Sequence, residues 1–223
     1  MKKLIITAVL TAGLLCGCVR SQVPESAPEE ISVSVDSAAQ LTESDVVSRG
    51  AELRKNYEGT VIQIIGEFSD IQVKTADDAL RCAAQVAHLM SMEEAFPQLR
   101  LARSDAPAGG FSYLFKQYSG DAEVVGAQLV ISGSEATGRV DNIYSSLKGK
   151  VDADPEIVFT AEQAKSLASE KYGDPKDPKL VVYSGRLAWD VELTSSKSEV
   201  YELYIDAKDP NGRVLDTEEV IED

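Results

Sequence analysis

Histidine and cysteine, the residues that most often act as bases, nucleophiles or metal ligands, are scarce in this chain of 223 residues. It has one histidine, His88, and three cysteines, Cys16, Cys18 and Cys82. A zinc peptidase site of the H-E-x-x-H type needs two histidines on one helix, and a structural zinc site needs four Cys or His ligands. Only Cys82 and His88 would remain available after the processing described below. We therefore predict neither a metal centre nor a cofactor.

No pattern of residues points to catalysis. His88 could formally complete a Ser-His-Asp triad, but on a predicted helix it shares a polar face with Arg81 and Gln85, which is typical of a surface histidine. Cys82 borders the apolar stripe of that helix, and we expect a small buried side chain rather than a nucleophile. The sequence has no glycine-rich phosphate loop, dinucleotide fingerprint or Gly-x-Ser-x-Gly motif. We expect a protein that is not an enzyme.

Carboxylates are the abundant functional groups. There are 37 Asp and Glu against 22 Lys and Arg, which gives a net charge of −15. This excess disfavours nucleic acid and anionic lipid surfaces as partners, because both bind basic patches. A hydrolase that uses carboxylates alone stays open as an alternative. The acidic stretch 206–216 departs from the calcium-loop pattern, since Lys208 and Pro210 stand where it requires Asp or Asn, and it predicts a turn.

The amino terminus has the layout of an export signal. Two lysines precede an uncharged, mostly apolar run, Leu4–Gly17, which is too short for the roughly 20 residues of a transmembrane helix. Residues 15–18, Leu-Cys-Gly-Cys, resemble the bacterial lipobox. The resemblance implies a signal peptide over residues 1–17, lipidation of Cys18, and attachment to a membrane through this lipid, in the bacterial cell envelope outside the cytoplasm. An ordinary signal peptide cut elsewhere is the alternative.

After such processing Cys82 would be the one free thiol, so we expect packed cores rather than a disulfide to stabilise the fold. Residues 18–42, with several Glu and Pro near their start, are predicted to form a flexible tether.

The rest of the chain is predicted to form two small modules, residues 43–150 and 151–223. In the first, residues 44–57 have modest helical spacing, and a longer helix begins with Thr75 as its N-cap. In the second, Thr160 and Gln163 form a capping box at the start of a helix. The strand patterns of the two modules lie at 60–68, 111–118, 124–131, 139–147, 180–183, 187–193, 201–205 and 214–215.

Successive strands with short turns and no helix between them favour antiparallel pairing. Strict alternation over 187–193 also predicts a strand with one buried and one solvent-facing side. The predicted fold class is therefore α+β, with each of the two modules a helix packed on an antiparallel β-sheet.

The second module resembles the PepSY domain, which occurs in propeptides of thermolysin-like metalloproteases and in separate exported proteins. The first module resembles the fungalysin/thermolysin propeptide region that precedes it. The segments that carry both resemblances are Thr-Ala-Glu-Gln-Ala at 160–164, the strand at 187–193, Ile-Asp-Ala-Lys at 205–208, Asn-Gly-Arg-Val-Leu at 211–215, Gln-Tyr-Ser-Gly at 117–120 and Val-Gly-Ala-Gln-Leu at 125–129.

The resemblance implies a stand-alone, non-catalytic lipoprotein without the protease domain, acting as a peptidase inhibitor or folding modulator. Its expected partner is an extracellular metallopeptidase. In the related precursors the segment after the last strand leads toward the protease cleft, so the end of this chain is the candidate partner-binding segment. Its residues are Glu218, Glu219, Val220, Ile221, Glu222 and Asp223. The alternative is a general cell-surface binding module for peptide or envelope polymer.

Overall fold

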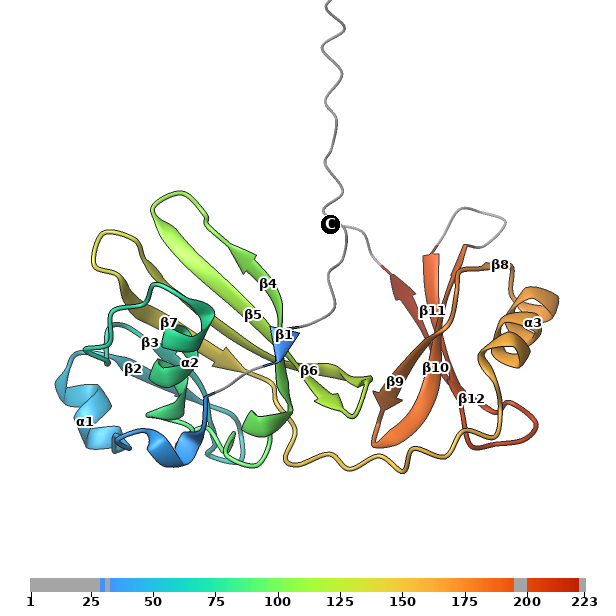
Figure 1. The fold of residues 1–223 in the computed structure, drawn as a ribbon, viewed down its shortest axis with the longest axis horizontal. Coiled ribbons are helices and arrows are strands. Elements are labelled where there is room, and N and C mark those ends of the chain that lie inside the picture. Colours follow the sequence, from blue (N-terminus) through green and yellow to red (C-terminus); the bar gives the residue numbers. More distant parts are fainter. Residues whose placement is uncertain (1–28, 31–32, 195–199, 221–223) are drawn as a thin grey trace, which may run out of the picture.

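The computed structural model describes residues 29–30, 33–194 and 200–220. Within these residues twelve strands form one sheet, ordered β1-β4-β5-β6-β9-β10-β11-β12, with β7, β3 and β2 branching from β6, and β8 paired with β10 (Figure 1). The strands are β1 (Glu29–Glu30), β2 (Glu52–Lys55), β3 (Val61–Ile65), β4 (Leu99–Asp105), β5 (Gly110–Ser119), β6 (Ala122–Ser134), β7 (Arg139–Ser145), β8 (Asp174–Pro175), β9 (Lys179–Tyr183), β10 (Arg186–Thr194), β11 (Val200–Asp206) and β12 (Val214–Val220). The α-helices are α1 (Glu43–Ser48), α2 (Ala76–Ala84) and α3 (Ala161–Lys171), and the 3₁₀ helices are η1 (Val35–Ser37) and η2 (Phe96–Gln98). No helix of the described residues is long and apolar enough to cross a membrane.

The predicted fold class, two separate helix-on-sheet modules, is wrong. The 13-residue strand β6 joins the parts that the sequence was expected to separate. It pairs antiparallel with β5 and β7, and near its start it pairs in parallel with β9, Glu123 with Val181 and Val124 with Val182. The succession of strands along the sequence predicted only antiparallel neighbours. The parallel contact was not predicted, because it joins strands that are far apart in the sequence.

Two large apolar cores lie along this one sheet, and β6 contributes to both. Its beginning supplies Val124 and Ala127 to the core that α3 covers, and its later residues Leu129 and Ile131 belong to the core that α2 covers. Figure 1 shows α1 and α2 at one end of the molecule and α3 at the other, with the strands between them. The division of the chain at residues 150 and 151 stays a prediction.

Capping residues fix the starts of the longer helices, as predicted. Thr75 Oγ1 accepts a hydrogen bond from the backbone of Asp78, whose carboxylate accepts one from the backbone of Thr75, and Thr160 with Gln163 repeats the arrangement at α3. Each pair satisfies backbone N–H groups that a helix start leaves free. The helix expected over 44–57 is shorter than predicted, because the chain turns at Gly50, with φ of 91°, into β2.

Residues that precede α1 pack on the first core. Val33, Val35, Ala38 and Leu41 contact it, and the backbone N–H of Leu41 donates to the carbonyl of Gln85 at 2.8 Å. The signal, Cys18 and most of the predicted tether lie outside the described residues.

The acidic stretch between β11 and β12 forms a turn, as predicted. The backbone N–H of Gly212 donates to the carbonyl of Asp209 at 3.0 Å, and that of Asn211 donates to the Asp209 carboxylate at 2.8 Å.

Candidate functional site

The side of β9–β12 that faces away from α3 carries tyrosines and carboxylates. Alternation along β10 places Trp189 and Val191 in the core with α3 and Asp190 on the opposite side. Tyr204 of β11 pairs with Asp190 and stacks on Tyr183 of β9, with 4.0 Å between the ring centroids and 16° between the planes. We call Tyr183, Glu202, Tyr204, Asp216 and Glu218 the tyrosine–carboxylate face.

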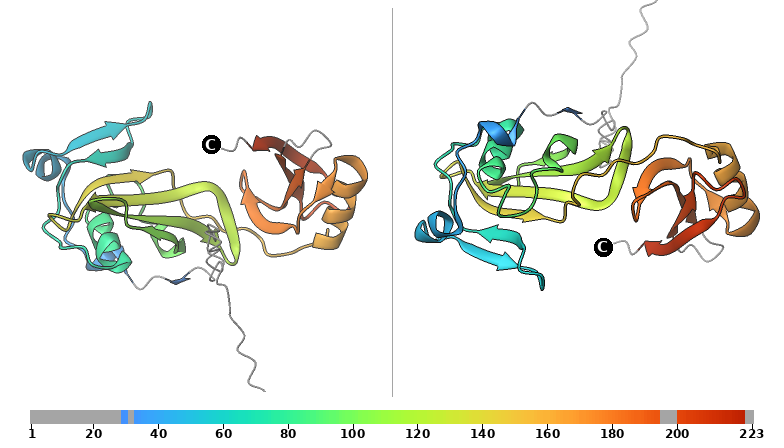
Figure 2. Two further views of the ribbon diagram at one scale, coloured as in Figure 1. Left: turned by 90° about the horizontal axis from the view of Figure 1, so that it is seen from above. Right: turned by 90° about the horizontal axis from the view of Figure 1, so that it is seen from below.

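The residues of β10 on this side, Ala188, Asp190 and Glu192, were predicted to face solvent, and that prediction is wrong for Ala188. Ala188 and Tyr204 are almost completely buried, and together with Val181 they form a small third core. Val125 of β6 packs against this core. The other part of the sheet therefore covers a surface that β10 alone would leave open, and Figure 2 shows β6 reaching β9 at this place.

Each of the two tyrosine hydroxyls binds carboxylates of the tyrosine–carboxylate face. Tyr183 Oη contacts a carboxylate oxygen of Asp216 and lies 3.1 Å from Oε1 of Glu218, both on β12. Tyr204 Oη donates to Glu202 Oε2 at 2.7 Å. Strands β9 and β12 are not neighbours in the sheet, so the hydrogen bonds of Tyr183 connect two strands that are otherwise separated by β10 and β11.

These bonds also move the pKa values of the two tyrosines and of Asp216 further from neutral pH. The hydrogen bond with Asp216 raises the pKa of Tyr183, whereas burial, followed by the bond with Glu202, raises the pKa of Tyr204. The same Tyr183 hydroxyl lowers the pKa of Asp216. At neutral pH both tyrosines are therefore neutral donors, and Asp216 is ionised.

A cavity of about 550 Å³ lies where the tyrosine–carboxylate face meets β5 and β6. Asp190 lines it, and within the described part of the chain its Oδ1 atom is buried without a hydrogen-bond partner. Burial, followed by repulsion from Glu202, raises the pKa of Asp190 to about 6. Asp190 thus changes charge close to neutral pH, at the junction of the two parts of the sheet.

The structure places part of the predicted partner-binding segment. Glu218 and Glu219 are exposed residues of β12, which ends at Val220 and pairs with β11. Glu218 belongs to the tyrosine–carboxylate face, whereas Glu219 follows it on the other side of the strand. Residues 221–223, Ile-Glu-Asp, and Cys18 lie outside the described residues.

Sequence analysis did not single out Tyr183, Tyr204 or Asp190 as site residues. A signal was present, because alternation over β10 and β11 places Asp190 and Tyr204 on one side. The alternation did not indicate that another strand covers that side, so there was no reason to expect a shifted pKa for Asp190.

His88 and Cys82 are both placed away from this face. Because α2 ends at Ala84, His88 lies in the turns that follow the helix and does not share the predicted helical face with Arg81; its Nδ1 is 2.8 Å from Oε1 of Gln40. Cys82 is fully buried, as predicted, and burial raises the pKa of its thiol to about 11. Such a thiol stays protonated at neutral pH and is a poor nucleophile.

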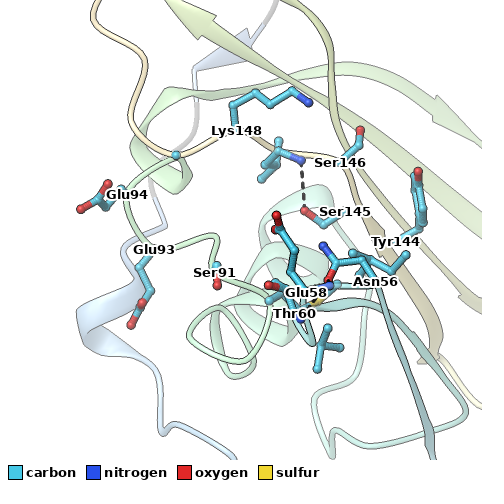
Figure 3. A pocket seen from close by; sticks show the side chains of 15 residues that line it. Asn56, Glu58, Thr60, Ser91, Glu93, Glu94, Tyr144, Ser145, Ser146 and Lys148 are labelled. Atoms are coloured by element: carbon cyan, nitrogen blue, oxygen red, sulfur yellow. Dashed lines mark hydrogen bonds between the residues drawn. The ribbon is translucent and has the colours of Figure 1, made fainter.

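A second, more polar hollow of about 600 Å³ lies between the β2–β3 turn, the turns after α2 and the end of β7 (Figure 3). Ser91 on its wall has φ of 53°, which is uncommon for a residue other than glycine. Figure 3 shows that the Glu94 side chain points away from Glu58, which lies on the other side of the hollow. Across residues 29–30, 33–194 and 200–220, no three or more His, Cys, Asp or Glu side chains are arranged to hold a metal ion.

Comparison with known proteins assigns no family to this chain. No protein-family model matches the chain, and no curated protein sequence matches it. Among solved structures it is similar to the Bacillus megaterium YpeB C-terminal domain, with a TM-score of 0.39 and 16% sequence identity over 77% of this chain and 76% of that one. A likeness at this level identifies neither a family nor an activity.

Proposed function

We propose that this chain is a non-catalytic, lipid-anchored protein of the bacterial cell envelope that binds an extracellular metallopeptidase and modulates its activity or folding. The observation that carries the proposal is the free edge of β12. Within the described residues β12 pairs with β11 alone, so its outer backbone N–H and C=O groups can pair with an extended segment of another protein.

The charge of β12 indicates what kind of segment would pair with it. Asp216, Glu218 and Glu219 are exposed, and Glu202 lies directly opposite Glu218 on β11. A segment with Lys or Arg side chains at alternate positions would pair its charges with these carboxylates while its backbone extends the sheet. A basic surface strand near a peptidase cleft is therefore the proposed contact.

Two further parts of the proposal come from the sequence. The propeptide resemblance of segments 160–164 and 205–208 motivates a metallopeptidase as the partner, and the lipobox resemblance of 15–18 motivates the anchor at Cys18. The proposed lack of catalysis is supported by the buried, protonated thiol of Cys82 and by the contact that holds His88 to Gln40.

The proposal is tested with the full lipidated chain, purified in mild detergent and used to capture proteins from an envelope extract. Captured material is assayed with a fluorogenic peptide, with and without a zinc chelator. We expect a chelator-sensitive peptidase whose rate falls, or whose refolding yield rises, when the chain is added. Capture of envelope glycan or of mixed peptides, without such a peptidase, would contradict the proposal and favour a general binding module.

Charge reversal on β12 then locates the contact. The Glu218→Lys/Glu219→Lys double variant should bind the peptidase at least about tenfold more weakly, since two attractive contacts become repulsive. The matched control is Glu135→Lys/Glu156→Lys, which makes the same charge change at two exposed residues outside β12. Equal weakening in both variants would show that net charge, rather than β12, determines binding. Deletion of 217–223 is a poorer test, because it also removes β12 residues that pair with β11.

A further inference from the structure

The two parts of the sheet are joined at a narrow place. The parallel contact between β6 and β9 consists of two residue pairs, Glu123 with Val181 and Val124 with Val182. The pairings on either side of this contact, β5 with β6 and β9 with β10, are antiparallel and longer. A short ladder of this kind is a weak point at which one part of the sheet can rotate against the other.

The cavity at this junction contains a buried carboxylate oxygen that has no hydrogen-bond partner among the described residues. This oxygen is Oδ1 of Asp190. Lys179 of β9 is the residue opposite Asp190 in the pairing of β9 with β10. By contrast, the Glu123 carboxylate on the same cavity wall lies 2.7 Å from Nζ of Lys116. Glu202, whose Oε2 accepts a hydrogen bond from Tyr204, also lines this cavity, and its repulsion is one of the causes that raise the pKa of Asp190.

We propose that Asp190 makes the β6–β9 junction a pH-sensitive hinge, closed when its carboxyl group is protonated and loosened when it is ionised. Ionised Asp190 faces Glu202 from β11 and Glu123 from β6, and opening the junction lets water reach the buried charge. Protonation removes the negative charge of Asp190, and with it both the repulsion from the two glutamates and the cost of burying a charge. This inference concerns the junction itself and does not depend on the proposed partner.

The other charged or titratable groups at the cavity do not cancel this effect. Lys179 is exposed and attracts ionised Asp190, but the net influence of its surroundings still raises the pKa of Asp190. Glu192, on the same strand, adds repulsion. The remaining such groups that line the cavity are Lys116, Tyr118 and Asp121 from β5 and the turn that follows it, and Tyr204 from β11.

The hinge is tested by measuring the distance between its two sides in the full mature chain. Spin labels are placed on Glu135→Cys, in the turn between β6 and β7, and on Glu170→Cys of α3, both exposed positions. Buried Cys82 is not expected to react. We expect a narrow distance distribution at pH 5 and a broader one at pH 8. Asp190→Asn should keep the narrow distribution at both values.

Asp121→Asn is the matched control, because Asp121 lines the same cavity but its side chain is fully exposed. This variant should behave as the parent chain does. Identical distributions at pH 5 and pH 8 in the parent chain would overturn the proposal, as would broadening that persists in Asp190→Asn. Carbon-13 NMR of the Asp190 carboxyl gives a second readout that needs no variant, and titration in the ordinary range near pH 4 would also overturn it.

Discussion

The indole Nε1 of Trp189 donates a buried hydrogen bond of 2.6 Å to the backbone carbonyl of Phe159. This bond connects the central strand β10 to the segment that leads into α3. The same segment is held from the other side, where the backbone N–H groups of Val158 and Phe159 both donate to the carbonyl of Ala207. The start of α3 is therefore positioned by long-range contacts as well as by its capping box.

Trp189→Phe should destabilise the protein by about 2–4 kcal/mol, because it leaves the Phe159 carbonyl without this donor and opens space in the core. Urea unfolding followed by circular dichroism measures the change in the free energy of unfolding. The control is Tyr57→Phe, which alters an aromatic side chain that is 96% exposed and should change stability by less than about 0.5 kcal/mol. Equal effects in the two variants would contradict the importance of the bond.

Gly212→Ala should also be strongly destabilising. Gly212 has φ of 64°, and a Cβ atom there would overlap the ring of Phe159. The control is Gly185→Ala, since Gly185 has a similar φ of 77° but no atom within 4 Å of the place that a Cβ would occupy. We expect about 1–2 kcal/mol for Gly185→Ala from backbone strain alone and about 2–4 kcal/mol for Gly212→Ala. A comparable loss of stability at both positions would show that the Phe159 ring moves aside without a free-energy penalty.

Asp190 predicts how stability depends on pH. Its pKa of about 6 in the folded chain lies above the unfolded value of 3.8, so the folded state binds the proton more tightly. The associated stability is fully present below about pH 4 and is lost as the pH rises through 6. Asp190→Asn should remove this decline and leave the protein more stable than the parent above pH 6, by about 1–2 kcal/mol after allowance for partial exposure. A less stable Asp190→Asn at pH 8 would contradict the sign of this effect.

The thiol of Cys82 should be nearly inert in the folded protein. Burial and a pKa of about 11 reduce its thiolate fraction at pH 8 by about 100-fold relative to an ordinary cysteine, before steric protection is counted. Reaction with a thiol reagent should therefore be at least that much slower in buffer than in denaturing urea. Fast labelling of the native mature chain would place Cys82 nearer to solvent than described.

Cys18 is predicted to carry the lipid anchor. Metabolic labelling with radioactive palmitate should mark the parent chain and Cys82→Ser, but not Cys18→Ser, and only the first two should sediment with membranes. Labelling of Cys18→Ser, or a fully soluble parent chain with an unmodified Cys18, would contradict lipidation.

Local signals in the sequence predicted local features of the fold. Thr75 and Thr160 begin helices because their capping partners lie three residues away, so the whole interaction is contained in a short segment. The same is true of the turn at Asp209–Gly212. Alternation likewise showed which residues of β10 share a side, because that follows from strand geometry alone.

Features that depend on distant segments were not predicted. Alternation does not say what covers each side, so Asp190 was assigned to solvent although β6 and β11 enclose it. The parallel contact of Val124 with Val182 depends on two strands separated by α3, and neither strand has a residue pattern that specifies the pairing. For the same reason the β4 strand was missed: its exposed end, with Arg103 and Asp105, has no apolar face, and it is stabilised by pairing with β5.

The pairing of β1 with β4 sets a limit on where the protein can operate. Glu29 is fixed opposite Leu101, so only the chain from residue 18 to residue 29 separates a lipid at Cys18 from the sheet. Eleven residue steps span at most about 40 Å even when fully extended. A lipid-anchored chain would therefore stay close to the bilayer surface, and it could contact only partners within a few nanometres of that surface. Lengthening the segment before Glu29 with Gly-Ser repeats would raise that working height without altering any contact of the folded part.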